Sequence, residues 1–212
     1  MSTTTRGRRR LAASVLAAVA VLTPALVPTA TAHAAPQSAP HAAPRAAAHP
    51  AVAAAKRLDI TMQAQQNSNW CWAASGDTIA SWFGRHYTQN QFCDAAFNRP
   101  QGSTCGNWQA ALDDVQNALD WMGINPGSYV SGYLRYGTVQ NEINAGRPIE
   151  TRIEWSSGGG HMHVLYGYDT SDNQVYWGDP WPSNYRYNWG DYDYYVSNDS
   201  FTWTHSLYGI GA

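Results

Sequence analysis

The residue best suited to nucleophilic chemistry is Cys71, which lies between two tryptophans where a polar loop gives way to a helical pattern. Ser68 or Asn69 is expected to cap this helix, which should cover 72–83. In the first turn, the partial positive charge of the helix N-terminus favours the thiolate, the nucleophilic form of cysteine. The alternative is an ordinary buried thiol, since free cysteine is among the most buried residue types. The local sequence leaves both interpretations open.

A thiol nucleophile needs a base within hydrogen-bond reach, and that base needs an orienting partner. His161 follows a run of serines and glycines and opens a predicted strand, where its imidazole can face a cleft. His163 lies two residues further on, so both imidazoles point to the same face of the strand. We take His161 as the candidate base and His163 as the alternative. The pair could also bind a metal ion, but it lacks a third ligand at a recognisable spacing, so we expect no metal.

The candidate orienting residue is Asp179, which ends the next predicted strand. A turn over 169–173 would bring this carboxylate back beside His161. There it would hold the imidazole tautomer and stabilise the imidazolium. The alternative role for Asp179 is a cap at a strand end before proline.

An acyl-transfer enzyme also needs hydrogen-bond donors for the oxyanion. The amide of Gln65, six residues before the cysteine, and the backbone N–H of Cys71 are candidates. Gln63 and Gln66 are neighbours of the same type, and the residues alone do not choose among the three.

The N-terminal quarter of the chain has the composition of a targeting and processing segment. Residues 1–34 combine four arginines, an apolar run and a small-residue ending, which is typical of a secretory signal peptide. Residues 35–57 are mostly Ala, Pro, His and Ser without an aromatic residue, which predicts a linker or pro-segment. Because Lys56-Arg57 ends this segment, we expect trypsin-like cleavage after Arg57. The predicted product is a secreted zymogen whose mature domain is 58–212.

The charge of the predicted mature domain differs from that of the whole chain. Seven of the 13 basic residues lie upstream, which leaves six against all 15 acidic residues, a formal net charge of −9. An acidic surface argues against nucleic acid and anionic membranes as partners. No later segment has the ~20 apolar residues needed to span a bilayer. We expect an extracellular monomer.

The cysteine count also bears on the candidate nucleophile. In an oxidising compartment, two of the three cysteines should pair. Cys93 and Cys105 are 12 residues apart across a loop-like stretch, and a disulfide between them would stabilise the fold by about 2–3 kcal/mol. Cys71 is then the free thiol, and a free cysteine in a secreted protein needs a reason.

Along the chain, the predicted elements that must position these residues are helices, followed by strands. Helical patterns cover 72–83, 88–97, 107–122 and 138–145. Strand patterns cover 149–155, 161–168, 174–177, 192–196 and 201–208, while 128–136 is irregular. This order predicts an α+β fold in which a helical lobe and an antiparallel β lobe enclose a cleft.

Three motifs, taken together and in this order, resemble the papain-like cysteine peptidases. They are Gln65-x5-Cys71-Trp72, His161 followed by Gly167-Tyr168, and Asp179-Pro180-Trp181. The closest resemblance is to the short secreted bacterial branch, which is staphopain-like or similar to a plant-pathogen effector protease. It carries the signature Gln-x3-Asn-Trp-Cys-Trp-Ala-Ala.

The resemblance implies a two-lobe papain-like fold and a role for each residue. Cys71 would be the nucleophile, His161 the general base and acid, Asp179 the orienting residue, and Gln65 the oxyanion donor. Trp181 would cover the His–Asp pair. The cysteine and histidine are 90 residues apart, against roughly 130–150 in larger members. Because the third residue is Asp rather than Asn, the surrounding subsites are also expected to differ.

The predicted activity is peptide-bond hydrolysis by a secreted cysteine endopeptidase, through a Cys-His-Asp triad and a thioester acyl-enzyme, without a cofactor. The same triad could instead perform transglutaminase-like amide exchange or peptidoglycan cleavage. A third alternative is a non-catalytic binding module, since the chain has ten Trp and 13 Tyr and these aromatics are dense over 177–203. Such aromatics could bind sugars or a protein partner, although packing in a small β lobe is their more usual role.

Overall fold

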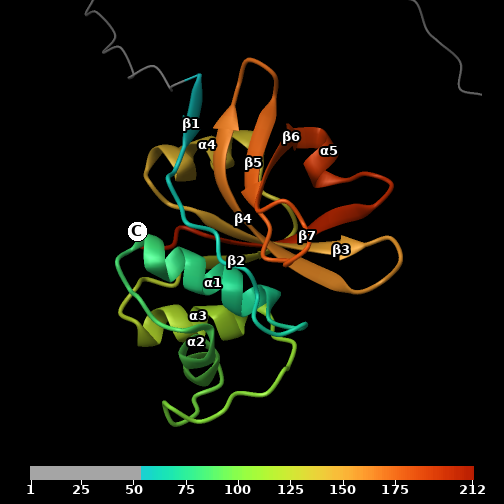
Figure 1. The fold of residues 1–212 in the computed structure, drawn as a ribbon. Helices are drawn as coiled ribbons and strands as arrows, with labels where there is room; N and C mark the ends of the chain where they lie inside the picture. The colour runs from blue at the N-terminus through green and yellow to red at the C-terminus, as the bar shows by residue number, and fades with distance from the viewer. Residues whose placement is uncertain (1–53) are drawn as a thin grey trace, which may run out of the picture. The chain divides into compact units, whose positions relative to one another are not determined.

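The helices that precede the sheet pack around buried aromatic side chains. The computed structural model describes residues 54–212, which belong to one compact unit of the chain. α1 (Cys71–Trp82), α2 (Gln89–Ala96) and α3 (Leu112–Trp121) lie together below the sheet in the view of Figure 1. Gly76 lets α1 and α2 approach closely, because a Cβ atom there would lie 2.3 Å from the ring of Phe92. These three helices form the predicted helical lobe.

Two helices begin differently from the prediction. The N-cap of α1 is Trp70, which makes no side-chain cap. Ser68 and Asn69, the expected caps, hydrogen-bond instead to Asn107. α3 begins only at Leu112, with Ala111 as its N-cap.

The predicted disulfide is present. Cys93 of α2 is bonded to Cys105 in the loop before α3, so the bond fastens this loop to the helical lobe. Within the described part of the chain, Cys71 is the free cysteine.

The second lobe is an antiparallel sheet. Its strands follow the order β2-β7-β3-β4-β5-β6, and β1 pairs with the far end of β4. The elements of this lobe are β1 (Ala55–Arg57), β2 (Ser128–Ser131), α4 (Tyr136–Asn144), β3 (Ile149–Trp155), β4 (Gly160–Asp169), β5 (Gln174–Gly178), β6 (Tyr187–Asp191), α5 (Tyr192–Val196) and β7 (Phe201–Tyr208).

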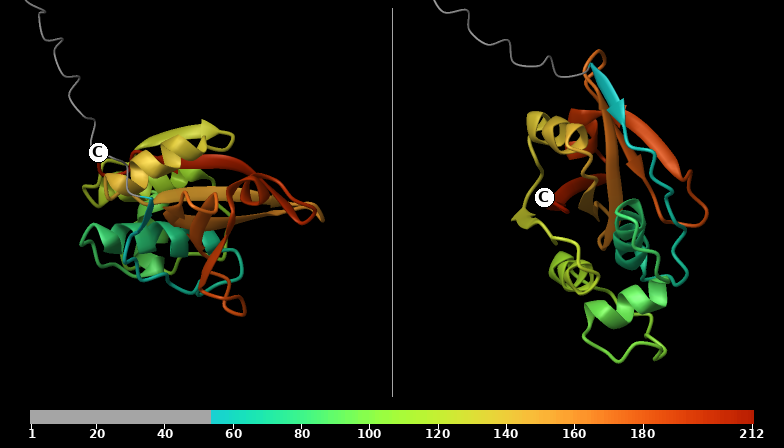
Figure 2. Two further views of the ribbon diagram at one scale, coloured as in Figure 1. Left: turned by 90° about the horizontal axis from the view of Figure 1, so that it is seen from above. Right: turned by 90° about the vertical axis from the view of Figure 1, so that its left-hand side faces the viewer.

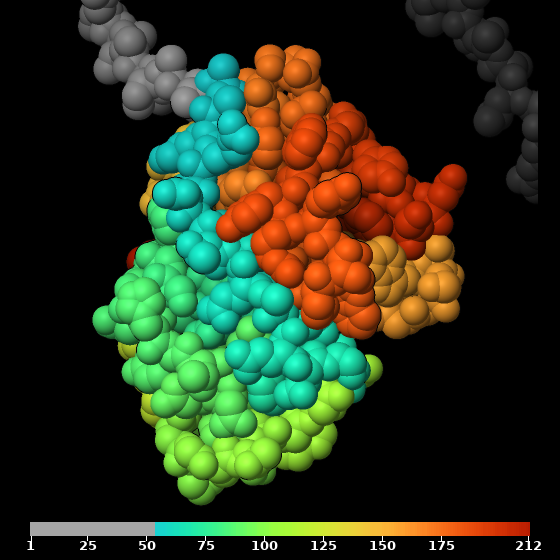
Figure 3. All heavy atoms as spheres, in the orientation of Figure 1, coloured from blue at the N-terminus to red at the C-terminus, as the bar shows by residue number. Residues whose placement is uncertain are grey.

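The sheet separates two layers of helix. Figure 2 shows α1 on one side of the long strand β4 and α4 on the other. The segment between β1 and α1 runs beside the β5–β6 hairpin (Figure 3), where the backbone N–H of Met62 donates to the Tyr187 hydroxyl. The two lobes therefore meet along α1 and β4. None of the helices in residues 54–212 is long and apolar enough to cross a membrane.

Three stretches differ from the predicted strands. The segment 192–196 is not a strand but the short helix α5, because Asp191 caps it by accepting a hydrogen bond from the Tyr194 N–H at 2.9 Å. Tyr192 and Tyr195, three residues apart, are both buried, as one face of a helix requires. The sheet gains β6 instead, and the stretch 128–136 contains the edge strand β2.

The predicted pro-segment contributes a strand to the domain. β1 pairs with the end of β4, with Arg57 opposite Gly167, and the Arg57 guanidinium lies 4.8 Å from the centre of the Tyr176 ring. The Lys56 ammonium donates to the Asn144 carbonyl at 3.0 Å. Cleavage after Arg57, which stays a prediction, would detach this strand from the chain. The predicted signal peptide and most of the segment 35–57 lie outside the described residues.

Candidate active site

The start of α1 is anchored by the two tryptophans that flank Cys71. The Trp70 indole N–H donates to the Gly106 carbonyl at 2.9 Å, and the Trp72 indole N–H donates to the Trp108 carbonyl at 3.1 Å. Both indoles are buried, whereas Cys71 itself is only half-buried. The first residue of the helix therefore presents its thiol at the surface of a rigid support.

Gln65 holds the loop that leads to this helix. Its side-chain amide donates to the carbonyls of Asn67 and Ser68, at 2.8 and 2.9 Å. Its backbone N–H donates to the Pro180 carbonyl at 2.8 Å, which ties the approach to α1 to the chain that follows β5. Both side-chain N–H groups of Gln65 thus already have partners inside the loop.

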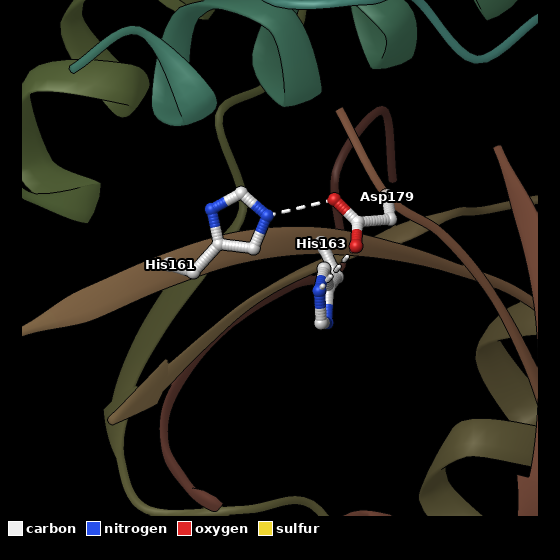
Figure 4. A group of neighbouring side chains, drawn as sticks. All are labelled: His161, His163 and Asp179. Carbon is white, nitrogen blue, oxygen red and sulfur yellow. Dashed lines mark hydrogen bonds and ion pairs between the residues drawn. The ribbon is translucent and has the colours of Figure 1, made fainter. Parts of the chain in front are cut away.

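His161 is the second residue of β4 and is 5% exposed. Its Nε2 atom lies 2.8 Å from the Asp179 Oδ1 atom (Figure 4), and Cys71 is its other side-chain hydrogen-bond partner. Trp155 stacks on the imidazole with ring centres 6.0 Å apart, and Trp181 meets it edge-on at 6.1 Å. The structure therefore brings Cys71, His161 and Asp179 together in one row.

Within this row, the negative charge of Asp179 stabilises the protonated form of His161, and the histidines stabilise the ionised form of Asp179. Burial alone would lower the pKa of His161, but its hydrogen bonds to Asp179 and Cys71 and the charges of both residues raise that pKa to about 9. Burial would raise the pKa of the Asp179 carboxyl, yet the two facing histidines hold it well below its usual range. Asp179 is consequently a carboxylate, and His161 is an imidazolium at neutral pH.

The turn after β5 fixes the Asp179 carboxylate. Oδ1 also accepts the backbone N–H of Trp181 at 2.8 Å, and Oδ2 accepts the Asn184 side-chain amide at 2.8 Å. The Arg186 guanidinium donates to the Asp179 backbone carbonyl. Sequence patterns did not indicate Asn184 or Arg186, because nothing distinguishes them from other polar turn residues before the turn is folded.

His163, the alternative base, faces the other oxygen of the same carboxylate. Its imidazole is almost fully buried and does not line the cavity that Cys71 and His161 share. Burial lowers the pKa of His163, so its ring is neutral. The geometry places His161, and not His163, beside the thiol.

One cavity of about 380 Å³ opens over Cys71. It lies between the helical lobe and the first residues of β4, which is where the two-lobe prediction puts the cleft. Arg152 is the one arginine or lysine among the described residues that line it. The lining residues are Ser68, Asn69, Cys71, Trp72, Gln109, Ala110, Arg152, Trp155, Gly159, Gly160, His161, Met162, Trp181 and Asn184.

The side chains of His161, His163 and Asp179 also form a group whose ligand atoms lie within 4.8 Å of one another, close enough to surround a metal ion. The hydrogen bond between His161 and Asp179 already joins two of those atoms. A metal ion would have to replace that bond.

Comparison with known proteins gives the family. Residues 54–197 match the family described as papain-like cysteine protease AvrRpt2. No curated protein matches the chain. Among solved structures, the peptidase domain of Streptococcus ComA, a bi-functional ABC transporter involved in a quorum-sensing pathway, aligns over 74% of this chain and 98% of its own length, with 18% identity and a TM-score of 0.52.

Two further structures give lower scores. A double glycine motif protease from an AMS/PCAT transporter, solved with its leader peptide, covers 74% of this chain and 95% of its own, with 16% identity and a TM-score of 0.47. Xylellain, a cysteine protease from Xylella fastidiosa, covers 74% and 86%, with 10% identity and a TM-score of 0.47. On the family match, the chain belongs to the papain-like cysteine proteases of the AvrRpt2 family, and it is a cysteine peptidase with the predicted α+β, papain-like fold.

Proposed function

We propose that this protein is a secreted endopeptidase that cleaves peptide bonds with Cys71, His161 and Asp179 as its triad. The observation that carries the proposal is the row itself. His161 has the Cys71 thiol as a hydrogen-bond partner on one side and the Asp179 carboxylate on the other, and both reacting residues line the same cavity. Nucleophilic catalysis requires this order of nucleophile, base and orienting group.

In the first step, the Cys71 thiolate attacks the carbonyl carbon of a bound peptide. The His161 imidazolium gives its proton to the nitrogen of the leaving amine as the C–N bond breaks, which leaves a thioester on Cys71. In the second step, neutral His161 takes a proton from water as the water oxygen attacks the thioester. The carboxylic acid product departs, and the thiolate–imidazolium pair forms again.

The oxyanion formed in each step needs donors. The backbone N–H of Cys71 stands at the start of α1, where a helix leaves its first N–H groups without intrahelical partners. The side chain of Gln65 is the second proposed donor. To serve, one of its N–H groups must turn from the carbonyl of Asn67 or Ser68 toward the substrate.

Export completes the proposal. The sequence of residues 1–34 supports it, and the disulfide between Cys93 and Cys105 is consistent with an oxidising compartment. N-terminal sequencing of the protein recovered from culture medium would test it. Protein that stays in the cells with residues 1–34 attached would contradict it.

The decisive experiment compares Cys71→Ala with the wild type on casein. We expect hydrolysis to fall to background while the melting temperature changes little. His161→Ala should be comparably inactive and His163→Ala mildly affected. An active Cys71→Ala variant would refute the proposal, and the reverse order of the two histidines would move the base to His163.

Two assays separate peptide hydrolysis from the other uses of the same triad. Incorporation of a dansyl amine would indicate amide exchange, and clearing of a cell-wall suspension would indicate peptidoglycan cleavage. Fast alkylation of Cys71 by iodoacetamide below neutral pH is expected of a catalytic thiolate. A slowly reacting thiol would favour a binding module instead.

A further inference from the structure

The Asp179 carboxylate faces two imidazoles, of which the proposed chemistry uses one. His161 bonds to Oδ1 at 2.8 Å, and the His163 Nε2 atom lies 3.6 Å from Oδ2 (Figure 4). The rings of the two histidines meet edge to face, with their centres 5.0 Å apart. His163 therefore contacts both the proposed base and the residue that orients it.

A chain of hydroxyl groups fixes the other side of His163. The Nδ1 atom lies 3.2 Å from the Tyr195 hydroxyl, which lies 2.7 Å from the Thr151 hydroxyl. All three side chains are buried, so their polar atoms depend on one another for hydrogen bonds. This series of hydrogen bonds runs from Thr151 in β3 through Tyr195 in α5 to His163, which faces the carboxylate.

The charge of Asp179 determines the direction of this chain. A carboxylate can only accept hydrogen bonds, so the Nε2 atom that faces it must carry the proton of the neutral ring. Nδ1 is then the acceptor, which makes the Tyr195 hydroxyl its donor. Tyr195 in turn accepts the proton of the Thr151 hydroxyl. In this direction each hydroxyl has an acceptor at hydrogen-bond distance, and the Nε2–H, which makes no hydrogen bond within the described residues, faces Asp179 Oδ2 at 3.6 Å.

We propose that His163 is a positioning residue: as the neutral Nε2–H tautomer, anchored by Tyr195, it supports the Asp179 carboxylate at the oxygen that His161 does not contact. The inference rests on the proposed function, because it concerns the orientation of the proposed base. Asn184 holds the same Oδ2 atom at 2.8 Å. His163 adds a further contact, because its ring lies against both the carboxylate and the His161 ring.

A neutral ring is essential to this role. A second imidazolium beside Asp179 would compete with His161 for the same negative charge and would weaken the hold on the catalytic imidazolium. Burial favours the neutral form of His163 and so keeps the charge of Asp179 available to His161. The two histidines that face this carboxylate therefore differ in charge, since His161 is cationic and His163 is neutral.

The test measures kcat and KM of four variants on a fluorogenic peptide, with melting temperatures as the control for folding. His163→Phe keeps an aromatic ring but has no nitrogen, whereas His163→Gln keeps an N–H at about the same reach. Tyr195→Phe removes only the anchoring hydroxyl. The fourth variant combines His163→Phe with Tyr195→Phe.

We expect His163→Phe to lower kcat roughly tenfold with KM within twofold, which is the low end of the losses caused by removing residues that orient metal-binding histidines. His163→Gln should recover most of the loss. Tyr195→Phe should lower kcat by a smaller factor, and the double variant should be no worse than His163→Phe, because both changes break one chain.

Three results would overturn the inference. Equal losses in the Phe and Gln variants would mean that packing, and not the N–H group, matters. Independent, multiplying losses in the double variant would mean that Tyr195 does not act through His163. Full activity of His163→Phe, with Cys71→Ala inactive, would refute the positioning role while leaving the triad intact. An active Cys71→Ala would refute the triad itself.

Discussion

Replacing Asp179 with Asn should move the alkaline limit of activity to lower pH. The substitution keeps the size of the side chain and an oxygen that can accept the His161 Nε2–H, but it removes the negative charge. In the wild type, His161 has a pKa of about 9 instead of 6.5. That difference corresponds to ~3 kcal/mol in favour of the imidazolium.

Two residues share this stabilisation. The hydrogen bond to Asp179 is the largest contribution that raises the pKa of His161, followed by the hydrogen bond to Cys71 and by the charges of Cys71 and Asp179. An opposite charge at hydrogen-bond distance raises the pKa of a base by about 1–3 units. We therefore expect Asp179→Asn to lower the pKa of His161 by about 1–2 units.

The direction of the effect follows from which form is active. The thiolate–imidazolium pair loses its imidazolium proton as pH rises, so wild-type kcat/KM should fall as pH rises through about 9. In Asp179→Asn the fall should begin about 1–2 pH units lower. Profiles of kcat/KM between pH 5 and 10.5 on one fluorogenic peptide would show the shift. An Asn184→Ala variant serves as the control, because it changes the same hydrogen-bond network without removing the charge.

One result would refute the reasoning. If Asp179→Asn had the alkaline limit of the wild type, the charge of Asp179 would not be what holds the proton on His161. Titration of the His161 ring protons by NMR, over the same pH range without substrate, would exclude an effect of substrate binding on the profile.

Three further predictions concern stability. Burial raises the pKa of Asp77 to about 6, so above that pH the fold holds a buried carboxylate. Asp77→Asn should stabilise the domain at pH 8 by about 1–3 kcal/mol. Below pH ~4 it should bring no gain, because the Asp77 carboxyl is then protonated in both the folded and the unfolded state. Equal unfolding midpoints of the variant and the wild type at pH 8 would contradict this. A domain that begins at Leu58 lacks β1 and should melt at a lower temperature than one that begins at Ala54, and coinciding melting curves would show that the strand adds nothing. Replacing both Cys93 and Cys105 with Ala should lower the free energy of unfolding by about 2–3 kcal/mol, measured by urea denaturation; a loss well below this range would mean that the loop is ordered without the bond.

The strands that border the site could be predicted from the sequence with little error. β3 and β7 begin and end where their patterns do, β4 extends one residue beyond its pattern at each end, and β5 extends one residue beyond at its C-terminal end. These segments have many β-branched and aromatic residues between turns rich in Gly, Asn and Asp, so local preference and tertiary structure agree. The order of helices before strands was sufficient to predict the two lobes.

Short elements could not be predicted, because tertiary contacts decide them. The segment 192–196 has strand-like composition, but a single cap at Asp191 and the burial of two tyrosines make it a helix. β1 lies in an alanine-rich stretch and becomes a strand only where the edge beside Gly167 is free to pair with it. The five residues of α5 and the three residues of β1 are too few to show the hydrophobic period of a helix or a strand.

The choice between the two histidines shows what a turn adds to a strand pattern. Alternation along β4 predicts correctly that His161 and His163 share a face. The pairing of Val164 with Gly178, continued by one residue, would place Asp179 opposite His163. Asp179 nevertheless bonds to His161, because the chain leaves the sheet at Pro180 and the turn that follows directs the carboxylate toward the first residues of β4. The fold of this turn, more than the position of any one residue in the sheet, therefore decides which imidazole bonds to Asp179 beside the thiol and which one faces the other carboxylate oxygen.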